Sequence, residues 1–322
     1  MGASEPVSFE RAVERFIEHY ISPKTTRPFS VTSKRNVRDN LLGSPLNAFR
    51  AKHGITAIDE WKGDDAAAYL RWLQMDLRRD SATVKKVRGQ LRSFGAFCDK
   101  EFGTAHAAGG ALATFTVSTV ADFDRPKERP LTHAEARVLL KAAPTLRDRL
   151  AIAMLLYTGM RPSELLALEE AGIHLDWVPP VVEVRGSVHD ADSAGAKTES
   201  RDVPLTIGQT TLVKLIRMHL ADPERPPVRG LIFLSKRGAR RTWQPLSLDG
   251  LRAMLADVGV ETGIKCNAYR LRHTFCTWCA TAGMAMSLLQ QLLGLKNADM
   301  VAPYYRGKKD QGAVEVAARL RF

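Results

Sequence analysis

The sequence predicts a mainly α-helical protein with a small antiparallel β-sheet, divided into two domains. The chain has 322 residues, enough for two ordinary domains. Its N-terminal part carries apolar residues at helical spacing, with no strand pattern between them. Its C-terminal part contains short alternating segments among further helical patterns.

The predicted N-terminal domain is helical and spans residues 6–103. Ser8 is a suitable N-cap for a first helix, whose apolar stripe runs to Tyr20. A second helix is predicted over residues 64–79, and a third begins at Ser81 and ends near residue 102. The following stretch, rich in Gly, Ala, Ser and Thr, predicts a linker over residues 104–128.

The predicted C-terminal domain spans residues 129–322 and is mixed α+β. Thr132 and Glu135 have the spacing of a capping box at a helix start. Residues 150–157 are apolar throughout and predict a buried helix, and Pro162 suits the first turn of the next helix. Residues 181–187, 201–205 and 231–235 are predicted strands of one antiparallel sheet.

The composition favours a soluble globular protein with a polyanionic partner. Hydrophobic residues make up 45% and charged residues 25%, and the net charge is +12. Such a charge attracts nucleic acid through counterion release and steering, although a basic enzyme of another kind would share it. No signal peptide or membrane span is visible in the sequence, so we expect a cytoplasmic protein without a membrane partner.

The four cysteines do not suggest a disulfide scaffold. Cys276 and Cys279 form a CxxC pattern, but a zinc site would need two more ligands, and only Cys266 and His273 lie near in the sequence. We therefore interpret the two cysteines as small buried residues. We expect no metal and no other cofactor.

Four segments of the C-terminal domain carry the residues that suggest chemistry. They read LLYTGMRPSELLAL (155–168), GAKTESRDVPL (195–205), AYRLRHTFCT (268–277) and LLQQLLGLKNADMVAPYYR (288–306). They contain Arg161, Lys197, Arg272 and Tyr304. Arginines grip phosphate oxygens bidentately, a lysine can protonate a leaving oxygen, and a tyrosine can act as a covalent nucleophile. The set suits phosphoryl transfer at a DNA phosphodiester.

In these segments and their order, the chain resembles the tyrosine recombinases, also called the phage integrase family. The resemblance covers nearly the whole chain. It implies a helical core-binding domain followed by a mixed α+β catalytic domain. It also implies site-specific cleavage and rejoining of duplex DNA through a 3′-phosphotyrosyl intermediate, without metal or ATP, as in DNA integration, excision or resolution.

The resemblance assigns a role to each of the motif residues. Arg161 and Arg272 would be the two phosphate clamps, with Glu164 orienting the first; without the resemblance, Arg161 and Glu164 could be a structural ion pair. Lys197 would protonate the 5′-hydroxyl leaving group, although a lone lysine between two strands is usually only a solvated surface residue. Tyr304 would be the nucleophile.

The neighbouring Tyr305 is the alternative nucleophile. Tyr304 lies nine residues after Leu295, which follows the LLG element, and this is the commoner spacing in the family. Two positions depart from the family pattern: Tyr269 and Leu295 stand where a histidine and a histidine or tryptophan are usual. Tyr269 either donates a hydrogen bond to a phosphate oxygen or packs as an aromatic residue, and we favour donation.

His273 follows Arg272 directly and is interpreted as a structural histidine. Successive side chains on a helix point about 100° apart, so His273 should point away from Arg272.

The partners implied are double-stranded DNA, a homotetramer on paired sites, and accessory DNA-bending or directionality proteins. Lys85, Lys86, Arg88 and Arg92 lie on the predicted third helix and could contact phosphates or simply form a solvated face. The terminal segment, residues 310–322, could dock on a neighbouring protomer or pack on its own domain.

Two rival functions remain compatible with the sequence. The departures at Tyr269 and Leu295 would suit a catalytically weakened DNA-binding protein on the same fold. A strand-nicking enzyme that resembles type IB topoisomerases would use the same phosphotyrosyl chemistry. Covalent capture of DNA separates the enzymes from the binder, and recombination between two sites separates the recombinase from the topoisomerase.

Overall fold

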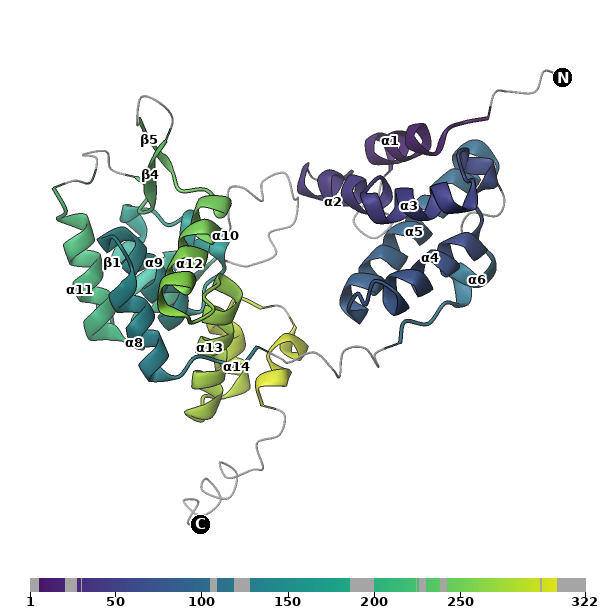
Figure 1. The fold of residues 1–322 in the computed structure, drawn as a ribbon. Helices are drawn as coiled ribbons and strands as arrows, with labels where there is room; N and C mark the ends of the chain where they lie inside the picture. Colours follow the sequence, from purple (N-terminus) through teal and green to yellow (C-terminus); the bar gives the residue numbers. More distant parts are fainter. Residues whose placement is uncertain are drawn as a thin grey trace, which may run out of the picture. The chain divides into compact units, whose positions relative to one another are not determined.

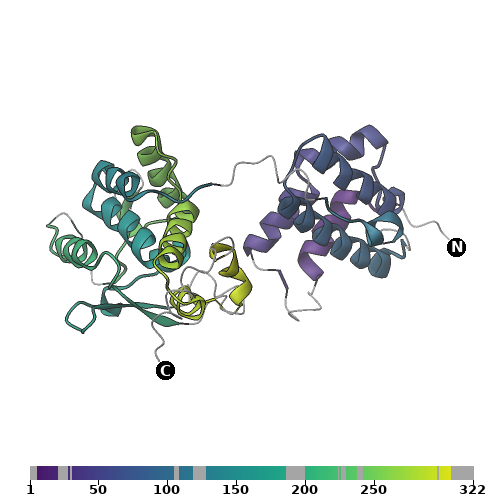
Figure 2. The ribbon, with the colours of Figure 1, turned by 90° about the horizontal axis from the view of Figure 1, so that it is seen from below.

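The computed structural model describes residues 6–20, 28–29, 31–104, 109–118, 128–185, 200–223, 225, 230–237, 242–295 and 297–305. These residues form two compact units, one that includes residues 6–118 and one that includes residues 128–305 (Figures 1 and 2). Both are mainly helical, and the second also carries short antiparallel strands, which confirms the predicted fold class.

The first unit is built from helices around an aromatic-rich core. Its elements are α1 (Phe9–His19), α2 (Val31–Leu41), α3 (Ser44–His53), the 3₁₀ turn η1 (Ile58–Glu60), α4 (Gly63–Met75), α5 (Ser81–Phe102) and α6 (Gly110–Thr114). Phe9 lies at the centre and meets Trp61 and Phe94 edge to face, at centroid distances of 5.4 and 5.3 Å. Such geometry is favoured by the quadrupoles of the rings.

The predicted helix starts in this unit are confirmed by their caps. Ser8 accepts a hydrogen bond from the Arg11 amide at 3.2 Å, and Asp80 accepts one from the Thr83 amide at 2.6 Å. The predicted second helix, however, ends at Met75 and not at residue 79. Arg78 adopts a positive φ of 46°, which is incompatible with continuing the helix.

Part of the predicted linker packs on the first unit. Residues 110–114 form α6, which packs against α4, and Leu112 is completely buried. Val117 also joins the core of this unit. The structure thus differs from the expected linker over residues 104–128, because part of this segment is packed. The apolar residues spaced among its alanines and glycines bury their side chains against the first unit.

The second unit is centred on α9, a helix buried along most of its length. Its helical elements are α8 (His133–Ala142), α9 (Leu146–Thr158), α10 (Pro162–Leu166), η2 (Glu170–Gly172), α11 (Gln209–Leu220), α12 (Leu248–Thr262), α13 (Ala268–Thr281), α14 (Met286–Leu292), η4 (Ala298–Met300) and η5 (Ala302–Tyr304). Helices α8, α10, α11 and α13 all pack against α9. The uniform burial of α9 explains why its sequence shows an apolar run and no polar face.

The strands form two small sheets among the described residues, not the single sheet predicted. β1 (Ile173–His174), β2 (Val181–Val184) and β3 (Arg201–Pro204) form an antiparallel sheet in that order. β4 (Leu234–Arg237) and β5 (Thr242–Pro245) form a separate antiparallel pair. The predicted strand over residues 231–235 overlaps β4 only at Leu234 and Ser235. Before it, Leu231 forms an isolated antiparallel bridge with Glu169, and Ile232 and Phe233 enter the core.

Several local predictions for the second unit are confirmed. Thr132 and Glu135 form the capping box of α8, in which the Thr132 amide donates to the Glu135 carboxylate at 2.8 Å and the Glu135 amide donates to Thr132 Oγ1 at 3.1 Å. Pro162 occupies the first turn of α10. Within the described residues, no helix combines the length and the apolar character needed to cross a membrane.

Candidate active site

The site is organised around one buried carboxylate, that of Glu164 on α10. Glu164 is 1% exposed. Its carboxylate accepts the Arg161 backbone amide at 2.7 Å and Arg161 Nη1 at 3.0 Å. Because Arg161 is the N-cap residue of α10, the capping interaction and the side-chain ion pair are made by the same two residues. The Arg161 side chain remains 25% exposed, so part of its guanidinium faces solvent.

Arg201 is a third arginine of the site, and our reading of the sequence assigned it no role. It lies at the start of β3 and donates from Nη1 and Nη2 to the two Glu164 oxygens at 3.1 and 3.0 Å. Its Nε donates to the Leu292 carbonyl at 2.7 Å. Arg201 belongs to the SRDVPL part of the second motif segment, so its position near the predicted site residues was visible in the sequence. Nothing in that segment shows, however, that the Arg201 side chain contacts α10 and α14.

Two arginines keep Glu164 ionised despite its burial. Burial by itself would raise the pKa of this carboxyl. The hydrogen bonds and the charge of Arg201, together with the backbone amide and the charge of Arg161, lower the pKa below its ordinary value. The cluster therefore holds one negative and two positive charges from these residues. Arg201 neutralises Glu164, which leaves the charge of Arg161 available to an anion.

At the end of α14, two backbone carbonyls accept hydrogen bonds from arginines of the site, and the backbone lies close to Arg201. The Leu293 carbonyl lies 3.5 Å from Arg161 Nη1, next to the Leu292 carbonyl that binds Arg201. Gly294 follows with a φ of +60°, and a Cβ atom there would lie only 2.7 Å from Arg201 Nη1. The glycine of the LLG element is therefore required both by its backbone conformation and by the arginine packed on it.

Arg272 approaches the same cluster from α13. Its Nη1 donates to the Gly159 carbonyl at 2.5 Å, in the turn just before Arg161. Burial lowers the pKa of Arg272, and the nearby charge of Arg161 acts in the same direction. Gly159 has a φ of +62°, and a Cβ atom there would lie 2.3 Å from the Phe275 ring. This turn thus allows α13 to pack closely enough for Arg272 to join the site.

Tyr304 and Tyr305 have different partners. Tyr304 lies in η5, and its ring centroid is 5.3 Å from that of His273 on α13. Burial, and then the neighbouring Cys276, raises the pKa of Tyr304 above its ordinary value. The Tyr305 hydroxyl instead donates to the Met284 carbonyl at 2.8 Å. Tyr304 is therefore the tyrosine directed to the helix that carries Arg272.

The two positions that depart from the family pattern have contrasting environments. Tyr269 is 71% exposed, and its ring is parallel to that of His273 at a centroid distance of 6.3 Å. Its exposure leaves the hydroxyl accessible and gives it no place in the core. Leu295 is 9% exposed and belongs to a hydrophobic cluster with Phe275 and Val301. His273 lies between the rings of Tyr269 and Tyr304 and so borders the site, although the sequence suggested only a structural histidine.

Lys197 lies outside the described residues, so the structure does not place it. The two strands on either side of it are described, and β2 and β3 pair antiparallel from Val181 with Pro204 to Val184 with Arg201. Arg201, at one end of this ladder, is held in the site by Glu164.

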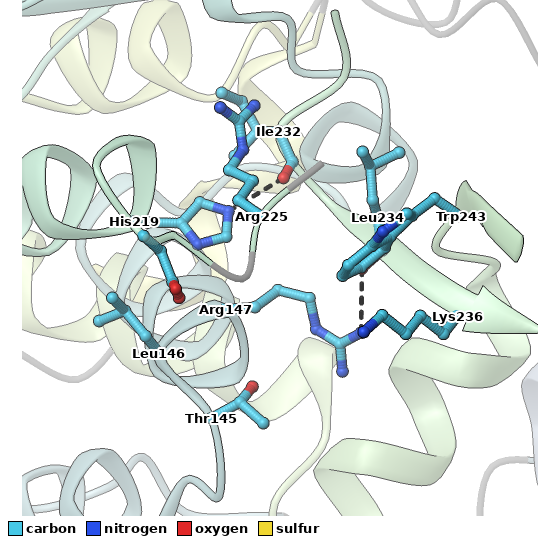
Figure 3. A pocket seen from close by; sticks show the side chains of 10 residues that line it. Thr145, Leu146, Arg147, His219, Arg225, Ile232, Leu234, Lys236 and Trp243 are labelled. Carbon is cyan, nitrogen blue, oxygen red and sulfur yellow. Dashed lines mark hydrogen bonds between the residues drawn. The ribbon is translucent and has the colours of Figure 1, made fainter. Parts of the chain in front are cut away.

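The four cysteines are buried and free. Burial raises the pKa of Cys276 to about 11 and that of Cys279 to about 12. A separate cavity of about 330 Å³ contains none of the predicted site residues (Figure 3). It is lined by residues of α9, α11, β4 and β5, among them the buried His219, whose Nε2 lies 3.1 Å from the Ile232 carbonyl.

The comparison with known families agrees with this arrangement. The model of the phage integrase family matches residues 129–311, which is more than half of the chain. This protein belongs to the phage integrase family. The match includes all four motif segments and the whole arginine cluster around Glu164.

Curated relatives of this phage integrase family member are named tyrosine recombinases. The XerA recombinase of Pyrococcus furiosus is 29% identical over 185 residues, which cover 56% of this chain and 59% of that protein. XerC of Bacillus pumilus is 25% identical over 313 residues, which cover 94% and 93% of the two chains. The chain thus spans somewhat more than half the length of the XerA protein, and nearly all of XerC.

Solved structures share the fold. The Tn1549 transposon integrase, in complex with transposon right end DNA, superposes with a TM-score of 0.68 at 18% identity, and the alignment covers 98% of this chain and 99% of the integrase. A lambda integrase dimer bound to a core site superposes with a TM-score of 0.64 at 17% identity, covering 94% of this chain and 79% of that chain. At these identities the likeness establishes the fold alone.

Proposed function

We propose that this phage integrase family member is a site-specific tyrosine recombinase that cleaves and rejoins duplex DNA. The observation that carries the proposal is the pairing of Arg161 and Arg201 with the carboxylate of Glu164, beside Arg272, which binds the Gly159 carbonyl in the turn before Arg161. Tyr304 packs against His273, the residue that follows Arg272 on α13. Three guanidiniums against one carboxylate leave an excess of positive charge, which a phosphodiester would neutralise.

Arg161 and Arg272 are the proposed phosphate clamps. Arg161 and Arg272 each donate side-chain hydrogen bonds from Nη1 alone, whereas Arg201 donates from Nε, Nη1 and Nη2 to the Leu292 carbonyl and Glu164. We therefore assign Arg201 a positioning role and the other two direct contact with the phosphate. Negative charge grows on the phosphate oxygens in the transition state, so fixed cations at these positions lower its free energy.

Tyr304 is the proposed nucleophile. The Tyr304 hydroxyl would lose its proton to solvent as its oxygen attacks the phosphorus, and the bond from phosphorus to the 5′-oxygen would break. Lys197 would protonate the departing 5′-oxygen, which becomes the 5′-hydroxyl. The product is a 3′-phosphotyrosyl bond, which retains the energy of the phosphodiester, so rejoining is the same step in reverse and needs no ATP. Tyr269, exposed beside His273, is proposed to donate to a phosphate oxygen in place of the family's histidine.

DNA is proposed to be bound by both units, the first acting as the core-binding domain expected over residues 6–103 and the second as the catalytic domain expected over residues 129–322. On α5 of the first unit, Lys85, Lys86 and Arg92 are exposed opposite the apolar stripe. Such a face can neutralise backbone phosphates. Two linked modules gain affinity through effective concentration, which favours a clamp around the duplex.

The proposed assembly is a homotetramer on paired sites, with accessory DNA-bending or directionality proteins as further partners. An apolar pocket of about 460 Å³ in the second unit, lined by Ile207, Phe275, Trp278 and Met284, is a candidate acceptor for the terminal segment of a neighbouring protomer. Docking of the terminal segment of one protomer into this pocket of the next would link the protomers that are assembled on the paired DNA sites. The proposed cellular location is the cytoplasm.

Covalent trapping tests the function. Nicked suicide DNA carrying the sequence that flanks the gene should yield a protein–DNA adduct that resists denaturation and disappears in Tyr304→Phe. Binding without any adduct would favour the catalytically weakened DNA-binding protein. Adduct formation without strand exchange between two sites would favour a strand-nicking enzyme that resembles type IB topoisomerases.

A further inference from the structure

The His273 side chain lies between two tyrosine rings of the site. Its ring is parallel to that of Tyr269, with an interplanar angle of 3° and a centroid distance of 6.3 Å. Its centroid lies 5.3 Å from that of Tyr304, at an interplanar angle of 44°. Both distances fall in the range at which aromatic rings attract each other. The roles proposed above account for the two tyrosines and leave His273 without a function.

Other histidines of the second unit are held by hydrogen bonds. His174 Nε2 lies 2.8 Å from a Glu183 oxygen, and the Nε2 of the buried His219 lies 3.1 Å from the Ile232 carbonyl. The His273 side chain is half-buried and is flanked by rings instead. Burial lowers the pKa of His273, so its ring is uncharged at neutral pH and can pack as an ordinary aromatic group.

Tyr304 depends on side-chain packing for its position, because its backbone is restrained by a single turn. It ends η5, a 3₁₀ turn of three residues, in which its amide donates to the Val301 carbonyl at 3.0 Å. Such turns are short and have poorer hydrogen-bond geometry than an α-helix. The tyrosine packs on a hydrophobic cluster that includes Phe275 and Leu295. The His273 ring gives it a second contact, from the residue directly after Arg272.

We propose that His273 is a positioning residue, whose ring holds the Tyr304 ring against α13 so that the tyrosine hydroxyl stays near Arg272. The inference rests on the proposed recombinase function for its kinetic consequence, whereas the ring contact belongs to the free protein. Arg272 is itself fixed by its hydrogen bond to the Gly159 carbonyl. A tyrosine held by the next residue of the same helix is therefore held at a defined place relative to this guanidinium. Small displacements of a reacting group can cost about a hundredfold in rate, so this restraint matters.

Four variants of the full-length protein test the proposal. His273→Ala removes the ring. His273→Phe keeps an aromatic ring and removes both nitrogens, whereas His273→Gln keeps polar atoms and removes the ring. His174→Ala is the matched control, because it removes another histidine of the same unit that is stacked on an aromatic ring, that of Trp177, at a centroid distance of 4.0 Å.

The first measurement is proton NMR of the DNA-free protein, which does not depend on activity. The Tyr304 ring signals are assigned through their loss in Tyr304→Phe, and the His273 ring signals through their loss in His273→Ala. A nuclear Overhauser cross-peak between the two rings is expected, since their centroids are 5.3 Å apart. The Tyr304 signals should move in His273→Ala and stay in place in His174→Ala. A missing cross-peak, or Tyr304 signals unchanged in His273→Ala, would overturn the contact and the proposal with it.

The second measurement is single-turnover cleavage of suicide DNA. Loss of an aromatic contact of this kind should slow cleavage about tenfold in His273→Ala and His273→Gln, at unchanged DNA affinity. His273→Phe and His174→Ala should stay within about threefold of the unmodified protein. Rescue by His273→Phe is the result that a ring contact requires.

Two results would overturn the positioning role. A His273→Phe rate as low as that of His273→Ala would assign the effect to a ring nitrogen, and a His273→Ala rate equal to that of His174→Ala would show that the ring does not matter. In both cases the adduct still forms in the unmodified protein, so the proposed function stands. If the unmodified protein forms no adduct, the proposed function fails and the positioning role fails with it.

Discussion

Arg201→Met should destabilise the second unit strongly, because it leaves a buried carboxylate with an incomplete set of partners. Glu164 is 1% exposed and Arg201 provides two of its four hydrogen bonds, at 3.1 and 3.0 Å. Removing one member of a buried pair typically costs about 3–5 kcal/mol. For a domain of this size, each kcal/mol lowers the unfolding midpoint by about 2–4 °C, so a fall of roughly 6–20 °C is expected.

Thermal unfolding followed by circular dichroism measures this effect. Arg185→Ala is the control, since Arg185 also pairs with a glutamate, Glu183, but its side chain is 64% exposed and solvent screens the pair. Its midpoint should not change measurably. The double variant Arg201→Met with Glu164→Gln should recover part of the loss, because no uncompensated buried charge remains. A fall of less than about 2 °C for Arg201→Met, or no recovery in the double variant, would refute the reasoning.

The remaining predictions concern catalysis and pH. Tyr304→Phe should bind DNA normally and form no covalent adduct, whereas Tyr305→Phe should still form it, as a gel assay with suicide DNA will decide. Arg272→Ala should slow single-turnover cleavage by about a hundredfold or more with affinity intact, and a loss below about tenfold would exclude the clamp role. If the Tyr269 hydroxyl binds a charged phosphate oxygen, Tyr269→Phe should slow cleavage about ten- to hundredfold. An unchanged rate would show that Tyr269 does not contribute this hydrogen bond. Because folding lowers the pKa of Glu164, this carboxylate stabilises the folded state at pH values above the ordinary carboxyl pKa, and the contribution should be lost as the pH falls through the lowered pKa. The free energy of unfolding, measured by urea titration at several pH values, should therefore fall less on acidification in Glu164→Gln than in the unmodified protein.

Local signals in the sequence predicted most of the elements that carry the site. The caps of α1 and α8 are short-range interactions between residues three positions apart, and they form as expected. Pro162 begins α10 for a similarly local reason. The end of α4 and the position of β4 were misjudged, because a positive φ at Arg78 and the burial of Phe233 depend on what the chain meets elsewhere.

The sequence alone predicted which residues carry the chemistry, and it determined to which family the chain belongs. Arginines, a lysine and a tyrosine in four ordered motifs are recognisable without coordinates, since residue type and spacing define them. Only the tertiary structure decided how these residues are supported. That Arg201 binds Glu164, that the Tyr304 ring lies against His273, and that Gly159 and Gly294 admit close neighbours all depend on contacts between distant segments. Such contacts follow from the packing of α10, α13 and α14 around a shared core, and no short-range pattern encodes them.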